Sequence, residues 1–186
     1  MKGKDMTTSR HVSTHEFRAT LRHYPTGVAL ITSRDEERAP VGLVVGSFTA
    51  VSLDPLLVGF LADHSSTTWP HIRRAGRFCV NVLGSHQESV CRAFTTKDPT
   101  RFDRLVDADV RQDPHLEGAI MWIDCQIETV LEVGDHDFVV GAVRDVRLAD
   151  EPNAPLVFVR GGYAEPRSTE TRTGHCHVAA DRSLTA

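Results

Sequence analysis

The chain has 186 residues, which is enough for one domain with a sizeable buried core. Its formal net charge is −4 and its basic residues are scattered, so nucleic-acid binding is disfavoured. No apolar run is long enough to cross a bilayer, and residues 1–17 are polar without an apolar leader. We therefore expect a cytoplasmic protein with no membrane segment.

The four cysteines form no CxxC pair. Cys79 and Cys125 lie in strand-like apolar runs, where a reduced thiol acts as a small hydrophobic group, and this usage fits a reducing compartment. The sequence His175-Cys176-His177 brings three metal-ligand types together, but adjacent residues rarely complete a tetrahedral site without distant partners. We interpret it as part of a solvated tail and expect no metal.

The N-terminal part of the chain predicts a loose segment, a short helix and a buried strand. Residues 1–12 are expected to be flexible. Ser13 and Glu16 have the spacing of a capping box, so a helix is expected from there to about His23. The turn residues 25–27 then lead into VALIT at 28–32, a continuous apolar run typical of a buried strand. The charged residues 34–38 form a hairpin-like connection to the next strand.

Residues 41–60, VGLVVGSFTAVSLDPLLVGF, contain two apolar runs with a small polar segment between them. Ser47, Thr49 and Val51 share one face of an extended chain, so short hydroxyl donors alternate with apolar side chains. Such a surface suits a flat ligand with polar edges. An equally open alternative is that the hydroxyls cap a bulge before the Asp54-Pro55 turn.

Residues 63–70, DHSSTTWP, precede a short basic helix that should end at Gly76. Four successive hydroxyl residues next to a helix N-terminus suit a phosphate group, although ordinary N-capping needs only one of them. After an apolar strand at 77–83, a second capping box at 85–88 should open a helix whose Val90 and Phe94 face the core.

Residues 95–103, TTKDPTRFD, are expected to form a loop. Its Lys97 and Arg101 could reach a phosphate, and solvated loop charges are the alternative.

The C-terminal third predicts a long β-hairpin. Alternation over 120–133 predicts a long strand with one dry face, Gly134-Asp135 gives a tight turn, and the chain returns as a strand over 136–146. A short strand at 155–160 follows, and the polar tail at 164–186 is expected to be flexible. The residues placed on the dry face are Cys125, Ile127, Thr129, Leu131 and Val133.

Strands outnumber helices and no βαβ alternation is visible, so we expect one mainly β domain over 13–163, an antiparallel barrel with a few peripheral helices. No GxGxxG, P-loop or catalytic triad is present, so a Rossmann dinucleotide site is not supported.

Several motifs in register, from about Phe17 to Tyr163, resemble the flavin reductase family, the NAD(P)H:flavin oxidoreductases that supply reduced flavin to partner monooxygenases. They are PTGV at 25–28, SFTAVSLDPLLVGF at 47–60, SSTTWP at 65–70, GRFCVNVL at 76–83 and GDHDFVVGAV at 134–143. The resemblance implies the split β-barrel of FMN-binding proteins, a homodimer with flavin at the subunit interface, and FMN or FAD with NADH or NADPH.

The resemblance also implies roles for particular residues. His136 would border the nicotinamide and orient it or supply a proton, and a purely structural role of this histidine beside the turn residue Asp135 is the alternative. The flavin or its phosphate would be held by the other candidate residues, which are Gly46, Ser47, Phe48, Thr49, Ser52, Ser65, Ser66, Thr67, Thr68, Lys97, Phe102 and Tyr163.

One departure from the family pattern is visible. Val44 and Gly46 stand where many relatives have Thr and Asn, so two polar side chains beside the flavin are missing and the choice between FMN and FAD stays open. Because the barrel does not by itself guarantee turnover, two further functions are alternatives to a reductase: a non-catalytic flavin-binding protein, and an oxidoreductase that retains its flavin and acts on another small molecule.

Overall fold

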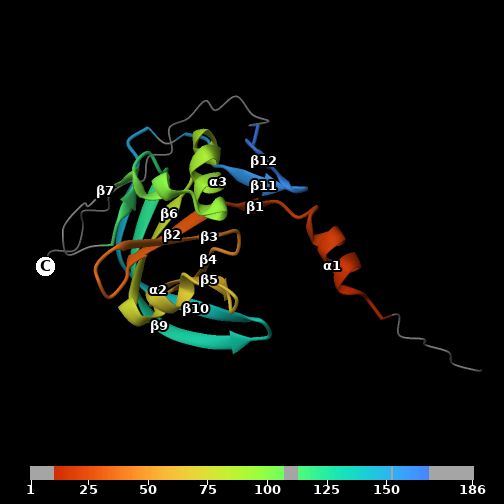
Figure 1. Cartoon of the computed structure of the whole chain (residues 1–186), viewed down its shortest axis with the longest axis horizontal. Coiled ribbons are helices and arrows are strands. Elements are labelled where there is room, and N and C mark those ends of the chain that lie inside the picture. Colours follow the sequence, from red (N-terminus) through yellow and green to blue (C-terminus); the bar gives the residue numbers. More distant parts are fainter. Residues whose placement is uncertain (1–10, 107–112, 152, 168–186) are drawn as a thin grey trace, which may run out of the picture.

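The computed structural model describes residues 11–106, 113–151 and 153–167. Its centre is a seven-stranded sheet with the order β3-β2-β6-β9-β10-β5-β4, in which all paired neighbours are antiparallel (Figure 1). The sheet curls into the predicted split barrel. Its strands are β2 Ala29–Arg34, β3 Pro40–Val45, β4 Thr49–Leu53, β5 Leu56–Asp63, β6 Arg77–Val82, β9 Met121–Val133 and β10 His136–Leu148.

Short elements surround the barrel. A three-stranded sheet joins β1 Thr26–Gly27, β11 Val157–Val159 and β12 Gly162–Ala164, and β7 Leu105–Val106 pairs with β8 His115–Leu116. The helices are α1 Thr14–Leu21, α2 Trp69–Ala75 and α3 Glu88–Thr96, with 3-10 turns η1 Ser85–Gln87 and η2 Pro99–Phe102. Both α2 and α3 contact β3, so this edge strand lies between two helices.

Two apolar clusters stabilise the fold. Inside the barrel, the ring of Phe60 meets Trp69 and Phe78 edge-on, with centroids 6.2 and 5.2 Å apart. Beneath α3, Val90 and Phe94 pack in a second cluster, as the helical spacing predicted. Each fully buried large apolar side chain contributes about 1.5–3 kcal/mol, so these clusters dominate the stability of the domain.

The first predicted capping box is confirmed, because the Ser13 hydroxyl accepts the Glu16 amide and the Glu16 carboxylate accepts the Ser13 amide. The second is wrong in register: the Gln87 side chain accepts the Gly84 amide at 3.0 Å, one residue earlier than predicted. The helix that follows is present as predicted.

The predicted loop at 95–103 is also wrong in part, since α3 continues to Thr96 and η2 occupies Pro99–Phe102. The reason is local. The Asp98 carboxylate accepts the Thr100 amide at 2.8 Å, and Pro99 in the first turn favours a helical start.

The predicted dry face of β9 ends at Ile127. A register shift opposite Val140 and Gly141 leaves Glu128 without a partner on β10, and a bulge of this kind exchanges the two faces of a strand. Val130 packs against the barrel core instead. On the predicted dry face, Thr129 is exposed and Leu131 and Val133 are 51% and 56% exposed.

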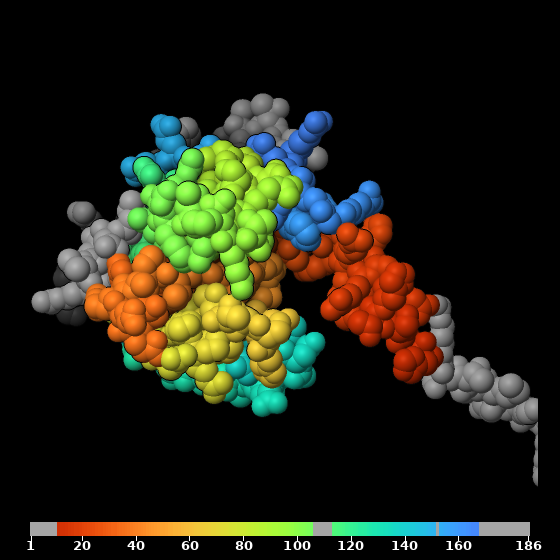
Figure 2. All heavy atoms as spheres, viewed as in Figure 1, coloured from red at the N-terminus to blue at the C-terminus, as the bar shows by residue number. Residues whose placement is uncertain are grey.

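The bulge creates an apolar outer row on the barrel, consisting of Leu61, Phe138 and Leu131 in direct cross-strand register on β5, β10 and β9. Leu61 and Leu131 are exposed. The helix α1 buries none of its residues and stands away from the barrel, so its Phe17 and Leu21 are also exposed (Figures 1 and 2). The described chain therefore presents two apolar surfaces without a cover.

Cys79, Cys91 and Cys125 are free and buried, as predicted for the first and last of these. No helix within the described residues is long and apolar enough to cross a membrane. The first residue of the predicted tail, Ala164, belongs to β12, whereas the His175-Cys176-His177 motif and the predicted flexible residues 1–10 lie outside the described residues.

Candidate functional site

A cavity of about 550 Å³ opens where β3, the loop that precedes α2, and the end of α3 meet. On the face drawn in Figure 2 the surface is hollowed where the α3 region (green) meets the α2 region (yellow). The candidate residues that line this cavity are Ser65, Ser66, Thr67, Thr68, Lys97 and Phe102. The structure therefore brings together six candidates from two segments, 65–68 and 97–102, that are well separated in the sequence.

The hydroxyl loop at 65–68 is held in shape from within. The Asp63 carboxylate accepts the Ser65 amide at 2.7 Å, and hydrogen bonds from the Ser65 hydroxyl first and its amide second lower the pKa of Asp63. The Ser66 hydroxyl accepts the amides of Thr68 and Trp69 at 3.3 and 3.2 Å. Ser66 is thus the residue that caps α2, and the Thr68 side chain makes no capping bond.

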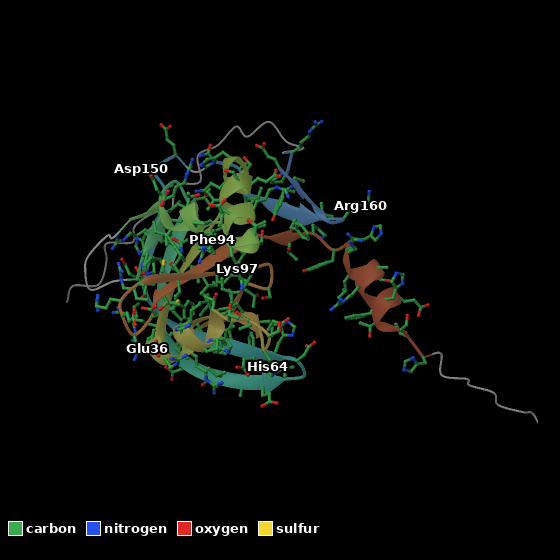
Figure 3. All side chains as sticks on the ribbon, in the orientation of Figure 1. Glu36, His64, Phe94, Lys97, Asp150 and Arg160 are labelled. Carbon is green, nitrogen blue, oxygen red and sulfur yellow. The ribbon has the colours of Figure 1, made fainter. Side chains whose placement is uncertain are left out.

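Positive charge reaches the cavity from the opposite wall. Lys97 extends from the end of α3 toward the loop before α2, and its ammonium donates to the Thr67 hydroxyl at 3.3 Å (Figure 3). Arg101 also lines the cavity, with its guanidinium over the Phe102 ring at 4.4 Å from the centroid. Hydroxyl groups facing two cations form a donor set that fits a phosphate group.

A narrower apolar recess of about 190 Å³ adjoins this cavity, since Val44 and Thr95 line both. The recess contains Gly46 and Tyr163 among the candidate residues. The Tyr163 hydroxyl lies 2.9 Å from the Cys91 sulfur, and burial raises the pKa of Tyr163 to about 12, so the phenol is neutral. A charged cavity beside an apolar recess suits a ligand with an anionic end and a flat apolar end.

The absence of a side chain at Gly46 makes room for another part of the protein, the side chain of Thr26. A Cβ at this position would lie 2.8 Å from the Thr26 hydroxyl oxygen, so any larger residue would push against β1. A residue with a side chain therefore does not fit at this position without movement of Thr26.

The remaining candidates of the central polar segment are engaged locally. The Ser47 hydroxyl accepts the Leu61 amide at 2.9 Å, the Thr49 hydroxyl donates to the Ala50 carbonyl, and the Ser52 hydroxyl accepts the Asp54 amide. Phe48 packs against the barrel core. These four residues line neither the cavity nor the recess, and of the three hydroxyl bonds only that of Ser52 lies at the Asp54-Pro55 turn.

His136 begins β10 directly opposite Asp63, the residue that starts the hydroxyl loop. Its Nδ1 lies 2.7 Å from the Asp135 carboxylate, the bond that chiefly lowers the pKa of Asp135, and its side chain is 36% exposed. The structure thus places His136 beside the loop, outside the lining of the cavity and the recess.

One supporting residue was missed from the sequence. The buried Asp137 carboxylate accepts the Trp69 indole N–H at 2.8 Å, lies 3.1 Å from the His64 ring and pairs with Arg73 at 3.3 Å. These bonds, that of Trp69 first, lower the pKa of Asp137. Asp137 therefore fixes α2 and the hydroxyl loop to β10. The sequence signal that could have identified Asp137 is a carboxylate at an inward-facing position of a strand, because an unpaired charge buried there is costly.

Comparison with known proteins identifies the family of the chain. Residues 21–167 match the flavin reductase like domain family. The chain is 50% identical over 148 residues to a flavin reductase of Pseudomonas putida, covering 79% of this chain and 86% of the relative. It is 37% identical over 170 residues to HsaB, the reductase subunit of a flavin-dependent monooxygenase of Rhodococcus jostii. This match covers 90% of this chain and 86% of the relative.

The solved structure of nitrilotriacetate monooxygenase component B from Mycobacterium thermoresistibile superimposes with a TM-score of 0.79 at 34% identity, covering 92% of this chain and 97% of that one. Sequence and fold agree. The chain belongs to the flavin reductase family.

Proposed function

We propose that the protein is an NAD(P)H:flavin oxidoreductase that supplies reduced FMN or FAD to a separate monooxygenase. The observation that carries the proposal is the cavity in which Lys97, Arg101 and the hydroxyl loop face one another, with an apolar recess beside it. The similarity to reductase components of flavin-dependent monooxygenases supports the monooxygenase as partner.

The residues of the cavity fit the phosphate end of a flavin nucleotide. Ser65, Ser66, Thr67 and Thr68 offer hydroxyl groups, while Lys97 offers a charge already within hydrogen-bonding distance of Thr67. The recess beside Val44, Gly46 and Tyr163 offers an apolar surface for the ring. Bound flavin accepts a hydride from the reduced nicotinamide, a reaction that needs ring alignment more than acid or base groups.

We assign His136 to the nicotinamide side of this site. The Asp135 carboxylate accepts from Nδ1, so Nε2 is the ring nitrogen left for a substrate. Since β10 pairs His136 with Asp63, the imidazole lies near the loop that we assign to the phosphate. Its role would be to orient the nicotinamide or to supply a proton after hydride transfer.

We further propose that the protein is a homodimer built on the apolar outer row of Leu61, Phe138 and Leu131. Two exposed leucines flanking a phenylalanine on neighbouring strands form a surface that a second copy would cover. The detached helix α1, with Phe17 and Leu21 exposed, supplies a second surface for the same partner. The three free buried thiols support an assignment to the cytoplasm.

The test of the reductase is the oxidation of NADH and NADPH by purified protein, with and without FMN, FAD and riboflavin. We expect oxidation that saturates with one flavin and stops when that flavin is omitted. Flavin binding without any oxidation of either nucleotide would refute the reductase and support a flavin-binding protein. Oxidation that quickens only with a non-flavin acceptor would support the flavin-retaining enzyme.

A further inference from the structure

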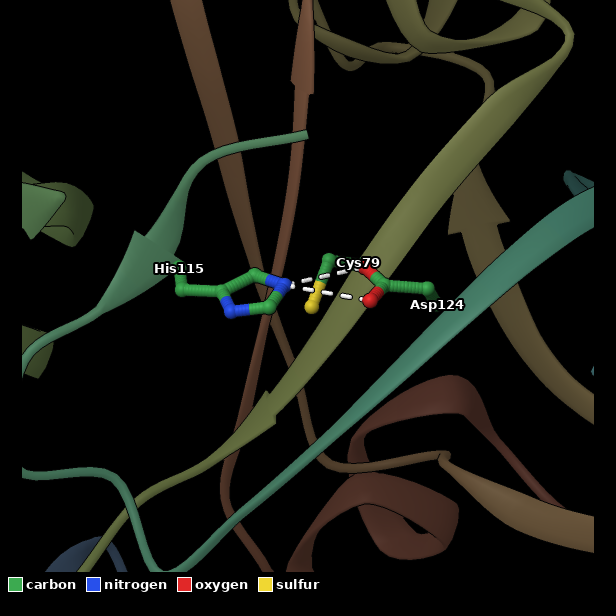
Figure 4. A group of neighbouring side chains, drawn as sticks. All are labelled: Cys79, His115 and Asp124. Carbon is green, nitrogen blue, oxygen red and sulfur yellow. Dashed lines mark hydrogen bonds and ion pairs between the residues drawn. The ribbon is translucent and has the colours of Figure 1, made fainter. Parts of the chain in front are cut away.

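Three side chains of different chemistry meet inside the protein, outside the flavin cavity. Cys79 on β6, His115 on β8 and Asp124 on β9 point toward one another (Figure 4). The His115 Nε2 lies 3.0 and 3.2 Å from the two Asp124 carboxylate oxygens, and one ligand atom from each residue falls within 4.8 Å of the others. No other group of three such ligands occurs among the described residues.

The fold holds these groups in place before any ligand arrives. Cys79 and Asp124 are direct partners in the pairing of β6 with β9. The strand that carries His115 is fixed to the barrel because the Asn81 amide oxygen accepts the Leu116 amide at 2.6 Å. The His115 ring also stacks on Trp122, with an interplanar angle of 23°. A site built on paired strands is more rigid than one built on loops.

The burial and charge of the cluster favour a divalent cation. Cys79 and His115 are 0% and 4% exposed, so a charge placed there needs a close partner. A thiolate, a carboxylate and a neutral imidazole around a doubly charged ion give no net charge. Sulfur and nitrogen donors with a single carboxylate select a borderline ion such as Zn²⁺ over Mg²⁺ or Ca²⁺.

We propose that Cys79, His115 and Asp124 form a binding site for one zinc-like divalent ion. The ion takes the place of the protons between the three ligands: the Cys79 thiol proton leaves to solvent, and the His115 imidazole stays neutral by carrying its proton on Nδ1 instead of on Nε2, the nitrogen that now faces Asp124. Bound there, it links β6, β8 and β9 and thereby fastens β8 to the barrel.

Access to the site comes from a second cavity of about 540 Å³, which Asp124 lines together with Asp113 and Arg77. Of the three ligands only Asp124 lines this opening, and we assign the opening as the path of the ion. Asp113 is buried and already pairs with Arg77 at 3.3 Å, so we do not count it among the ligands.

The competing explanation is a hydrogen-bonded network in which the Cys79 thiol and the His115 ring both donate to Asp124. The experiment is a titration of the full-length protein with Co²⁺, followed by absorption. The protein carries His175→Ala, Cys176→Ser and His177→Ala, so that the C-terminal motif cannot supply ligands. We expect one Co²⁺ per chain, with thiolate-to-cobalt charge transfer and the visible bands of a tetrahedral ion.

Cys79→Ser keeps a hydrogen-bond donor but removes the thiolate, so it should abolish the charge-transfer band and weaken Co²⁺ binding at least about tenfold. Cys125→Ala, which removes another buried thiol from the barrel, is the matched control and should keep the band. His115→Gln provides a second ligand variant should Cys79→Ser fold poorly. No charge-transfer band in the protein with an intact cluster, or a band that persists in both ligand variants, would overturn the proposal.

Discussion

The phosphate end of the proposed flavin site depends on a few hydroxyl side chains. Each of them can be replaced by an apolar side chain of similar volume. Ser66 and Thr68 lie in the loop that faces Lys97 across the cavity. We assign the phosphate of the flavin nucleotide to this loop. Their contribution is therefore specific to a flavin that carries a phosphate, and riboflavin serves as the internal reference.

Replacing both residues, as Ser66→Ala with Thr68→Val, should weaken FMN binding about tenfold or more, because each hydrogen bond to a charged group contributes about 1.5–3 kcal/mol. Riboflavin affinity should change little. Fluorescence titration measures both. Thr68→Val alone leaves the Ser66 cap intact, so it separates the loss of a ligand contact from the loss of that cap. Thr96→Val is the control, because the Thr96 hydroxyl bonds only to the Arg92 carbonyl. Equal losses for FMN and riboflavin would move the phosphate elsewhere.

His136→Ala should lower kcat for NADH or NADPH oxidation about tenfold or more while the flavin dissociation constant stays nearly unchanged. The reason is that His136 lies outside the lining of the cavity and the recess. Steady-state kinetics with the flavin held at saturation give the comparison. His23→Ala, an exposed histidine near α1, is the matched control. A His136→Ala enzyme with the full kcat would leave His136 only its structural role beside Asp135.

At the scale of elements, the site depends on how α2 is fastened to the hairpin of β9 and β10. Asp137 makes that connection through Trp69, His64 and Arg73. Asp137→Asn keeps an acceptor for the indole but loses the charge, which should cost about 1–3 kcal/mol in the free energy of unfolding. Flavin nucleotide binding should weaken as the loop loosens. Denaturant unfolding and FMN titration measure the two effects, and an unchanged FMN affinity would show that the loop holds its shape without Asp137.

The inside of the barrel also limits which residues the strands accept. A Cβ on Gly141 would lie 2.5 Å from the Phe78 ring, which is fully buried, so Gly141→Ala should destabilise the fold by about 1–3 kcal/mol. Gly27→Ala is the matched control, since its added methyl group would meet no atom within 4 Å. Thermal unfolding compares the two. Equal midpoints for both variants would mean that the barrel relaxes around the added carbon.

The elements also show what sequence patterns can predict. The first capping box, the strand at 28–32 and the turn at Gly134-Asp135 were predicted because each depends on neighbours in the chain. The bulge at Glu128 was not, since it depends on the register of β10 against β9, and it moved Leu131 from the core to the surface. The hydroxyl groups and Lys97 could be named as site residues from the sequence alone. Asp137 could not, because its hydrogen-bond partners come from other elements.

At the scale of the whole molecule, the apolar outer row is the surface on which the proposed homodimer depends. Leu131→Glu places a charge at its end and should shift the protein from dimer to monomer in sedimentation velocity, with loss of activity if the flavin site needs both subunits. Val146→Glu, at an exposed valine farther along β10, should leave the dimer intact. A dimer that survives Leu131→Glu would place the interface elsewhere on the surface.

We propose that the cavity between α3 and the hydroxyl loop binds a flavin that the reduced nicotinamide then reduces. The most direct measurement is anaerobic rapid mixing of the protein and FMN with NADH or NADPH, followed by the visible absorbance of the flavin. We expect the absorbance to be lost at a rate that saturates with the nucleotide and that falls with His136→Ala. FMN that binds yet stays oxidised with both nucleotides, FAD giving the same result, would contradict it.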